Sequence, residues 1–372
     1  MSKTTTAVTL ACLAFAAIAA PAAAGAAGIP EIPAKPEGFV PFYAANEEIA
    51  TIGRDVGRLW SFPTQRVEAI IQRIFWERDG LGFTYRAHPT LTAVEAYAQH
   101  EGNCLSLVNL FVAMARSAGL RAFFVDVEDF EAFYRYGETV VRSTHVVGGV
   151  MIDGALRTVD FLPERDKRYR RLSPIDDARA TAHYFNAIAA EAMLDGDLVR
   201  AEGLFKQALA FDAGFSDPWN NYAVLLRRSG RLDDGIEVLE KALALDRHFL
   251  PAIENLATYY RLAGKAELAG RMDARALDEK TKNPYFVYQQ ALNRFQEGKP
   301  AEAEQLLHRA RRLDSKFPEV YLLLGRIELD RGERSKAESH FAKAKKLGAE
   351  HSDAFQRGLD AKIRQLLVVS EG

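Results

Sequence analysis

PWNNYAVLLRRSGRLDDGIEVLEKALAL, at residues 218–245, is the stretch that decides the fold of the second half of the chain. Four of its small residues, Ala223, Gly230, Gly235 and Ala242, recur every 34 residues. The four series run in phase through five copies without an insertion: Ala189, Ala223, Ala257, Ala291 and Gly325; Gly196, Gly230, Gly264, Gly298 and Gly332; Ala201, Gly235, Ala269, Ala303 and Ala337; Ala208, Ala242, Ala276, Ala310 and Ala344. A fixed period of this length indicates stacked structural repeats.

Each copy is expected to consist of two antiparallel helices. Small residues would lie where the helices cross, because two backbones approach closely only where the side chains between them are short. The recurring glycine, such as Gly230, would lie at the turn between the helices, where glycine adopts a positive φ at little cost. Large apolar residues fill other packing positions, for example Leu204, Phe205, Leu239, Leu307 and Phe341.

The period and the small residues resemble those of tetratricopeptide repeats over residues 182–351. The second copy, with Trp219 and Tyr222, is similar to the family pattern, whereas the third departs from it at Asp273, where a large apolar residue is usual. An amphipathic helix at about 353–368, within the terminal segment 352–372, is expected to cap the open end. The resemblance implies an all-α solenoid of five repeats, at 182–215, 216–249, 250–283, 284–317 and 318–351.

The resemblance also implies a concave groove lined by the first helix of each repeat. In the family, the fifth and twelfth repeat positions face this groove. Here the fifth positions are Asn186, Asn220, Glu254 and Tyr288, and the twelfth are Arg227, Arg261 and Phe295. An extended peptide or the tail of a protein partner would bind there. The same residues also fit a merely solvated polar surface, and both interpretations stay open.

The first half of the chain is expected to form a separate domain. A linker punctuated by proline, residues 27–45, precedes this domain, which is assigned to residues 46–178. Residues 62–78 form an amphipathic pattern typical of a helix, and residues 121–127 are typical of a strand. Thr92, followed three residues later by a glutamate, predicts a short helix with a capping box.

Cys104 is predicted to lie at the beginning of a helix. The sequence EGNCLS, residues 101–106, opens an apolar segment that continues to Gly119. The helix dipole stabilises a thiolate at this position, and the thiolate is the nucleophilic form of cysteine.

A β-hairpin is predicted around Asp153-Gly154, because Asp-Gly is a strong signal for a two-residue turn. The strands it joins are residues 145–152 and 155–161. This turn places Val147 opposite Asp160, and His145 shares a face with Val147 because side chains alternate along a strand. His145 and Asp160 are then diagonal neighbours, roughly 7–8 Å apart at the backbone and within side-chain reach. An imidazole beside a carboxylate is therefore expected from the register.

The order of these motifs resembles that of the transglutaminase-like superfamily, which shares its arrangement with papain-like cysteine proteases. The matching stretches are GNCLS (102–106), HVV (145–147) and TVD (158–160), and the resemblance covers about residues 60–165. It implies an α+β domain in which the helix that begins at the cysteine packs against a sheet carrying the histidine and the aspartate.

The resemblance assigns catalytic roles to Cys104, His145 and Asp160. Cys104 would attack an amide carbonyl, His145 would hold and return the proton, and Asp160 would orient the imidazole. The backbone N–H of Cys104 is the natural donor to the oxyanion, and Gln99 or Asn103 are candidates for a second donor. Taken singly, the three residues also fit a core cysteine, a surface histidine and a strand-end cap.

Other chemistry is less well supported by the residues. His88, His100 and Glu101 lie near Cys104 in the sequence, but their spacing matches no common zinc pattern, and we expect neither a metal nor a cofactor. No acidic loop resembling an EF-hand supports activation by calcium. Leu105 stands where the animal cross-linking enzymes have an aromatic residue, and hydrolysis by water is favoured over transfer to a lysine.

Composition and the N-terminus indicate an exported protein. The formal net charge is −2, so no overall basic field implies a nucleic-acid partner. Residues 1–26 resemble a secretory signal peptide with a short apolar core and a small-residue cleavage region, although a retained membrane anchor or a lipidated Cys12 are alternatives. No later apolar run is long enough to span a membrane. After cleavage Cys104 is the single cysteine, and the location would be periplasmic or extracellular in a bacterium.

Three interpretations of function follow. The first is an exported thiol peptidase, amidase or acyltransferase that recruits a protein substrate or partner through its repeats. The second is a non-catalytic adaptor in which only the repeats are functional. The third is a cross-linking transamidase. The sequence does not distinguish oligomeric states.

Overall fold

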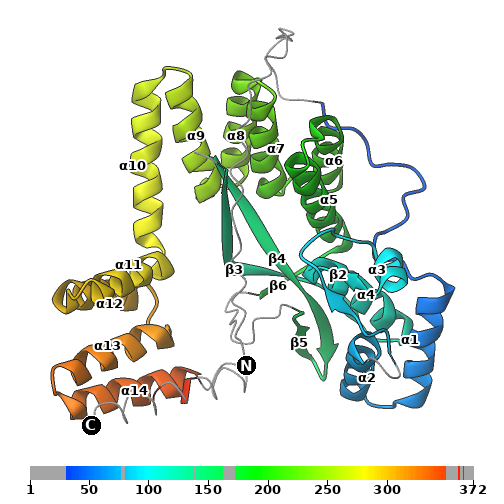
Figure 1. The fold of residues 1–372 in the computed structure, drawn as a ribbon, viewed down its shortest axis with the longest axis horizontal. Coiled ribbons are helices and arrows are strands. Elements are labelled where there is room, and N and C mark those ends of the chain that lie inside the picture. Colours follow the sequence, from blue (N-terminus) through cyan, green and yellow to red (C-terminus); the bar gives the residue numbers. More distant parts are fainter. Residues whose placement is uncertain are drawn as a thin grey trace, which may run out of the picture.

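The computed structural model describes residues 31–76, 80–136, 139–161, 172–348, 359, 360 and 363. A part built of helices and a sheet is followed by a curved row of helix pairs (Figure 1). The helices of the first part are α1 (Glu47–Leu59), α2 (Pro63–Phe75), α3 (Ala93–Gln99) and α4 (Cys104–Ser117). Its strands are β1 (Thr84–Tyr85), β2 (Glu101–Gly102), β3 (Ala122–Tyr136), β4 (Thr139–Ile152), β5 (Ala155–Val159) and β6 (Leu172–Ile175).

Four of these strands form an antiparallel sheet in the order β5-β4-β3-β6. β4 and β5 pair as the hairpin predicted from Asp153-Gly154, from Ile152 opposite Ala155 to Gly148 opposite Val159. Asp153 and Gly154 both have positive φ, 51° and 77°. These values are those of the two-residue turn that Asp-Gly favours. The predicted hairpin register is therefore confirmed over the paired residues.

α4 is the central helix of the first part. Eleven of its residues are buried, including Leu107, Leu110 and Met114. It packs directly on β4 at Gly148, where a Cβ atom would lie 2.7 Å from Cδ1 of Phe111. Glycine at this position lets the helix approach the strand closely.

In the second part, the described residues 177–348 form five helix pairs. They are α5 (Asp177–Leu194) with α6 (Leu198–Phe211), α7 (Ser216–Arg228) with α8 (Leu232–Leu245), α9 (Leu250–Leu262) with α10 (Ala266–Lys282), α11 (Pro284–Gln296) with α12 (Pro300–Leu313), and α13 (Pro318–Asp330) with α14 (Arg334–Gly348). The glycine expected at each turn has a positive φ, between 71° and 85°, in all five pairs. The 34-residue period is therefore confirmed as a period of helix pairs.

Small residues lie at the helix crossings, as the period predicts. Ala189, Ala223 and Ala291 are fully buried. In the fifth pair the equivalent residue is Gly325, where a Cβ atom would lie 2.4 Å from the ring of Phe341. The aromatic ring fills the space that the alanine methyl group occupies in the other copies.

The first helix pair also belongs to the core of the first part. Ala180, Tyr184 and Phe185 of α5 are buried in the same hydrophobic cluster as α1, α2 and α4. The ring of Tyr184 stacks on Phe42 with the centroids 4.6 Å apart. The predicted boundary between residues 178 and 182 thus crosses a continuous core.

β3 and β4 extend well beyond the rest of the sheet. β6 pairs with β3 only at 124–127, and β5 pairs with β4 only at 148–152. The remaining length forms a two-stranded arm with an irregular register between Val127 and Ala132. β4 lies against α7 and α9, the first helices of the second and third pairs (Figure 1).

Several predicted segments differ from the structure or lie outside it. The helix predicted at 62–78 ends at Phe75, because the backbone of Trp76 is extended. The signal peptide at 1–26 lies outside the described residues, as does most of the predicted capping helix. Of that helix, Leu359 and Ile363 are described, and they are buried against the last pair.

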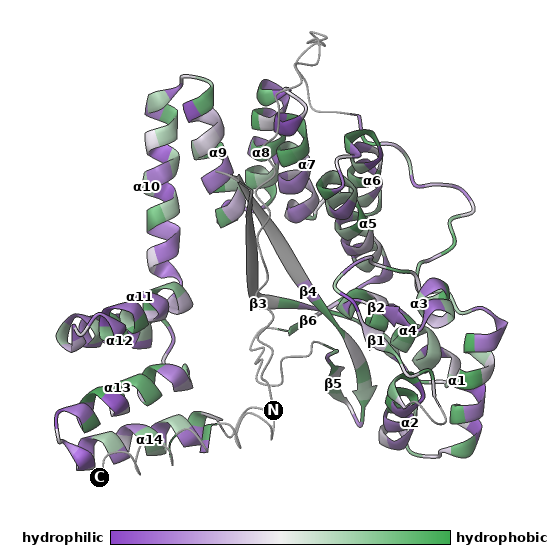
Figure 2. Cartoon of the chain, in the orientation of Figure 1, coloured by the Kyte–Doolittle hydropathy of each residue, from purple (hydrophilic) through white to green (hydrophobic). Residues whose placement is uncertain are grey.

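The helices carry both apolar and polar residues, as expected for helices that are partly buried. Figure 2 shows apolar and polar residues alternating along the helices of the repeats. Within the part of the chain that the structure describes, no helix is both long and apolar enough to span a bilayer.

Candidate functional site

Cys104 is the first residue of α4, as the sequence predicts. Asn103 caps the helix, because its side-chain oxygen accepts a hydrogen bond from the backbone N–H of Ser106 at 3.0 Å. Gly102 has a φ of +157°, and a Cβ atom there would lie 2.5 Å from Cβ of Ser106. The glycine two residues before the cysteine is therefore required by the close return of the first helical turn. Cys104 is half-buried at this turn.

His145 and Asp160 form a hydrogen-bonded pair. Nε2 of His145 lies 3.0 Å from Oδ1 of Asp160. The side chain of His145 is 2% exposed and that of Asp160 is 26% exposed. A carboxylate only accepts hydrogen bonds, so Nε2 of His145 carries the proton in this contact.

The helix that begins at Cys104 packs on the strand that carries His145. Phe111 of α4 contacts Gly148 of β4, and its ring lies 5.9 Å from that of Phe161, the residue after Asp160. α4, β4 and the end of β5 thus meet in one core.

Asn103 is hydrogen-bonded at both ends of its side-chain amide. Its amide nitrogen donates to Oγ1 of Thr90 at 2.6 Å, and its oxygen accepts from Ser106. The side chain is therefore an N-cap, and one of its two amide N–H groups is given to Thr90; a role as oxyanion donor stays a prediction. Gln99, the other candidate, is the exposed last residue of α3.

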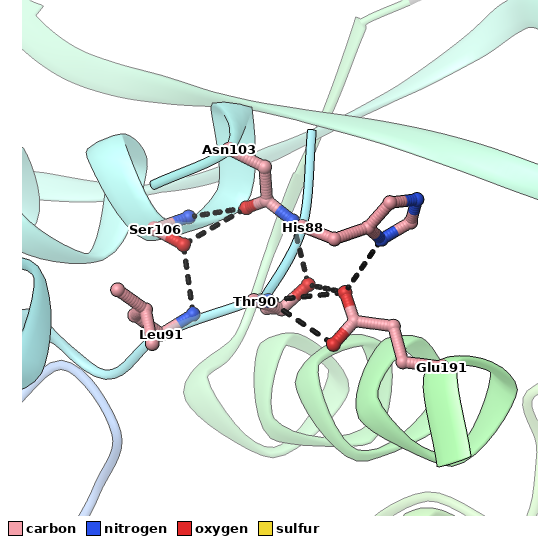
Figure 3. A network of polar contacts seen from close by, with 6 residues as sticks. All are labelled: His88, Thr90, Leu91, Asn103, Ser106 and Glu191. Carbon is pink, nitrogen blue, oxygen red and sulfur yellow. Dashed lines mark hydrogen bonds and ion pairs between the residues drawn. The ribbon is translucent and has the colours of Figure 1, made fainter. Parts of the chain in front are cut away.

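A hydrogen-bond network that the sequence did not indicate connects this helix start to the repeats (Figure 3). Glu191 of α5 accepts hydrogen bonds from the backbone N–H and the hydroxyl of Thr90. Thr90 in turn accepts from Asn103. Glu191 and Thr90 are 101 residues apart, so no local spacing marks the contact.

Two of the predicted groove residues are buried between the repeats. Asn186 is 5% exposed and Asn220 is fully buried. Oδ1 of Asn186 accepts from Asn221, and Oδ1 of Asn220 accepts from Asn255. The prediction that these two side chains face a partner is corrected, because they connect neighbouring repeats by hydrogen bonds. Asn221 and Asn255, each 35 residues after its acceptor, were missed; this offset is the only signal that could have found them.

The other predicted groove residues have intramolecular contacts of their own. Arg227 lies over the ring of Tyr259 at 5.8 Å. Glu254 forms an ion pair with Lys280, and Arg261 with Asp273 at 2.9 Å. Tyr288 and Phe295 of α11, in the fourth repeat, are half-buried. Tyr288 packs on Phe317 with ring centroids 5.1 Å apart. The described residues contain no group of three or more His, Cys, Asp or Glu side chains that could hold a metal ion.

Comparisons with known proteins identify the repeats. A family model of the tetratricopeptide repeat matches residues 192–258 and 294–359. A crystal structure of MamA is 21% identical and covers 44% of this chain and 95% of its own, with a TM-score of 0.24. MamA from Desulfovibrio magneticus RS-1 is 16% identical over 46% of this chain and 96% of its own, with a TM-score of 0.26. Pseudomonas aeruginosa pilF is 18% identical over 53% and 95%, with a TM-score of 0.28. A comparison with curated proteins found no match.

The chain therefore carries tetratricopeptide repeats, in a mostly helical fold whose second half is a solenoid of this kind. Repeats of this kind suggest protein binding or scaffolding. The three structures have TM-scores too low to add to this conclusion. The resemblance of residues 60–165 to transglutaminase-like domains stays a prediction.

Proposed function

We propose that this chain is a scaffold that binds a protein partner through its repeats. The observation that carries the proposal is the unbroken row of five helix pairs, two stretches of which match the family model. A row of stacked repeats offers an extended concave surface that suits a peptide or a protein tail.

The fourth repeat offers the best surface for this partner. β4 lies along α7 and α9, and Asn186 and Asn220 are buried. On α11 the predicted groove positions hold the half-buried aromatic residues Tyr288 and Phe295. Aromatic side chains supply much of the binding free energy at protein interfaces. A partner with apolar side chains at regular spacing therefore suits this helix.

Photo-crosslinking tests the scaffold proposal. Benzoylphenylalanine placed at Tyr288 should give a discrete protein adduct in the source cells. The matched control is the same group at Leu313, a 41% exposed residue of α12. Substitution of Phe295 by alanine should weaken the adduct from position 288. If positions 288 and 313 gave the same protein adducts in the same yield, the proposal would be contradicted.

A second function is favoured by the His145–Asp160 pair. We propose that Cys104, His145 and Asp160 form a thiol site in a papain-like, transglutaminase-like domain, and that this site hydrolyses or transfers an amide. The 3.0 Å hydrogen bond supports the proposal, as do the nearly complete burial of His145 and the position of Cys104 at a helix N-terminus.

The chemistry assigns one role to each residue. The Cys104 thiolate adds to the amide carbonyl, and the backbone N–H of Cys104, at the N-terminus of α4, is the natural donor to the oxyanion. Collapse of the tetrahedral adduct breaks the C–N bond, and the imidazolium of His145 gives its proton to the leaving amine. Water then cleaves the thioester with His145 as the base, and Asp160 keeps the ring oriented. A lysine held at the site in place of water would give cross-linking instead.

Alkylation of Cys104 tests the thiol site without a known substrate. Iodoacetamide labelling at graded pH, read by mass spectrometry, should proceed well below the ordinary thiol pKa of about 8.5. His145→Ala should move this profile to higher pH. A profile centred near 8.5 that His145→Ala leaves in place would favour the non-catalytic scaffold alone.

A further inference from the structure

We infer that Glu191, on the first helix of the repeats, is a positioning residue for Cys104 and acts through Thr90 and Asn103. The inference rests on the proposed thiol site and adds to it that the first repeat is part of that site. A substitution in this repeat would then alter the reactivity of Cys104 although the substituted residue does not contact Cys104.

Glu191 holds the segment before α3 with both carboxylate oxygens (Figure 3). The backbone N–H of Thr90 donates to these oxygens at 3.0 and 3.1 Å, and the Thr90 hydroxyl donates to one of them at 2.6 Å. Nδ1 of His88 lies 3.4 Å from the same oxygen. The Glu191 side chain is 19% exposed, whereas Thr90 is 6% exposed. Charge-assisted bonds of this kind are stronger than neutral ones, particularly where water is excluded.

The carboxylate fixes the direction of every hydrogen bond that follows. A hydroxyl has one proton, and Thr90 gives it to Glu191 because a carboxylate only accepts. The Thr90 oxygen therefore accepts from Nδ2 of Asn103 at 2.6 Å. This contact turns the amide oxygen of Asn103 toward Ser106, where it accepts from the backbone N–H at 3.0 Å and from the hydroxyl at 2.9 Å.

A second branch closes the network. The Ser106 hydroxyl gives its proton to Asn103 and accepts from the backbone N–H of Leu91 at 2.8 Å. Thr90 and Leu91 are consecutive, so the same short segment is held from α5 and from α4. Ser106 is fully buried and Asn103 is 9% exposed. The network leaves the Asn103 amide one orientation in which all partners are satisfied.

This orientation acts on Cys104 because Asn103 is the cap of its helix. A capped first turn points its free N–H groups and its dipole at the residue that opens the helix. Glutamine at position 191 replaces one of the two acceptor oxygens by an N–H₂ group, so the Thr90 hydroxyl is no longer forced to donate to residue 191. In the orientation that turns the N–H₂ group to this hydroxyl, Thr90 donates to Asn103 instead, and the Asn103 oxygen leaves Ser106, which weakens the cap.

The experiment compares isosteric variants by the pH profile of Cys104 alkylation with iodoacetamide in the full chain. Glu191→Gln should lower the rate of Cys104 alkylation at pH 7 about fivefold, the effect of a lost N-cap. It should also move the pH profile of alkylation to higher pH. Thr90→Val, which removes the hydroxyl but keeps the shape, should do the same, and Thr90→Ser should retain the original profile. Glu202→Gln is the matched control, because Glu202 is a hydrogen-bonded carboxylate of the same repeat that binds Tyr222 instead.

The outcomes separate the inference from the proposal on which it rests. If wild-type Cys104 is alkylated well below the ordinary thiol pKa and neither Glu191→Gln nor Thr90→Val moves this pH profile, the positioning role alone is overturned. A wild-type profile near the ordinary thiol pKa overturns the thiol site and this inference with it. If Glu191→Gln does not fold, the contrast between Thr90→Val and Thr90→Ser decides, and equal profiles for these two overturn the inference.

Discussion

At the scale of single residues, the region around Cys104 depends on positions that have no room for a side chain. A Cβ atom on Gly102 would collide with Ser106, and one on Gly148 would collide with Phe111. The first glycine lets α4 begin directly after β2, and the second lets α4 lie against β4. These two close approaches explain the glycine of the Gly-x-Cys motif and the glycine within β4.

The His145–Asp160 hydrogen bond allows a graded prediction. In the proposed thiol site, His145→Ala removes the proposed base, whereas Asp160→Asn keeps the ring and weakens only its orientation. The pH midpoint of Cys104 alkylation should therefore rise in both variants, and less in Asp160→Asn. Circular dichroism should show both variants folded. A larger shift for Asp160→Asn than for His145→Ala would contradict the assigned roles.

At the scale of elements, helices are joined where small residues or ion pairs let them meet. Gly325 gives α13 its contact with α14 in the last repeat, because the Phe341 ring occupies the space of a methyl group. Between the two parts of the chain, Arg116 of α4 donates two hydrogen bonds to Asp177 of α5, at 2.7 and 3.0 Å. The Arg116 guanidinium also lies over the Tyr43 ring at 4.9 Å.

Gly325→Ala should destabilise the chain by about 1–3 kcal/mol, because the added methyl overpacks the crossing of α13 and α14. Gly270→Ala is the control, since a Cβ atom on that helical glycine meets nothing within 4 Å. It should stabilise the chain by about 0.5–1 kcal/mol through helix propensity. Urea denaturation followed by circular dichroism measures both. Equal effects of the two substitutions would mean that the crossing is not tightly packed.

The Arg116–Asp177 pair predicts a pH dependence of the junction between α4 and α5. Burial raises the pKa of Asp177, but hydrogen bonding and charge from Arg116 outweigh it and lower the pKa below its ordinary value. Stability from a lowered carboxyl pKa is present above the unfolded value of about 3.9 and is lost as the pH falls through the folded pKa. Asp177→Asn should therefore cost roughly 0.5–1 kcal/mol at pH 7 and almost nothing near pH 2. Urea denaturation at both pH values tests this, and a cost independent of pH would contradict it.

At the scale of the whole molecule, three contacts besides the Arg116–Asp177 pair illustrate how the two parts are connected. α5 shares the core of the first part, Glu191 holds Thr90, and β4 lies along α7 and α9. The first three repeats are therefore in direct contact with the first part of the chain (Figure 1).

Removal of the arm formed by residues 128–144 tests the third connection. A short turn in its place should keep the paired base of the sheet, Ala122–Val127 with His145–Val150. Amide hydrogen exchange should become faster in α7 and α9, which lose the cover of β4, and stay unchanged in α13. Mass spectrometry of peptic peptides reads both regions. Unchanged exchange in α7 and α9 would mean that β4 does not protect them.

The sequence by itself determined the features that depend on short spacings. A 34-residue period predicted the helix pairs and their turns, and Asp153-Gly154 predicted the register that brings His145 to Asp160. The start of α4 at Cys104 followed from the apolar segment that begins there. Periodicity and turn chemistry act between near neighbours, so a single sequence displays them.

Only the tertiary structure decided which distant segments meet. Glu191 with Thr90, the amide pairs of Asn186 and Asn220, and the position of β4 on the repeats have no local signal. From the sequence, the side-chain amide of Asn103 is a candidate oxyanion donor. Only the structure shows that it caps α4 and donates to Thr90. Such contacts arise because burial forces each polar group to find a partner among whatever surfaces packing brings together.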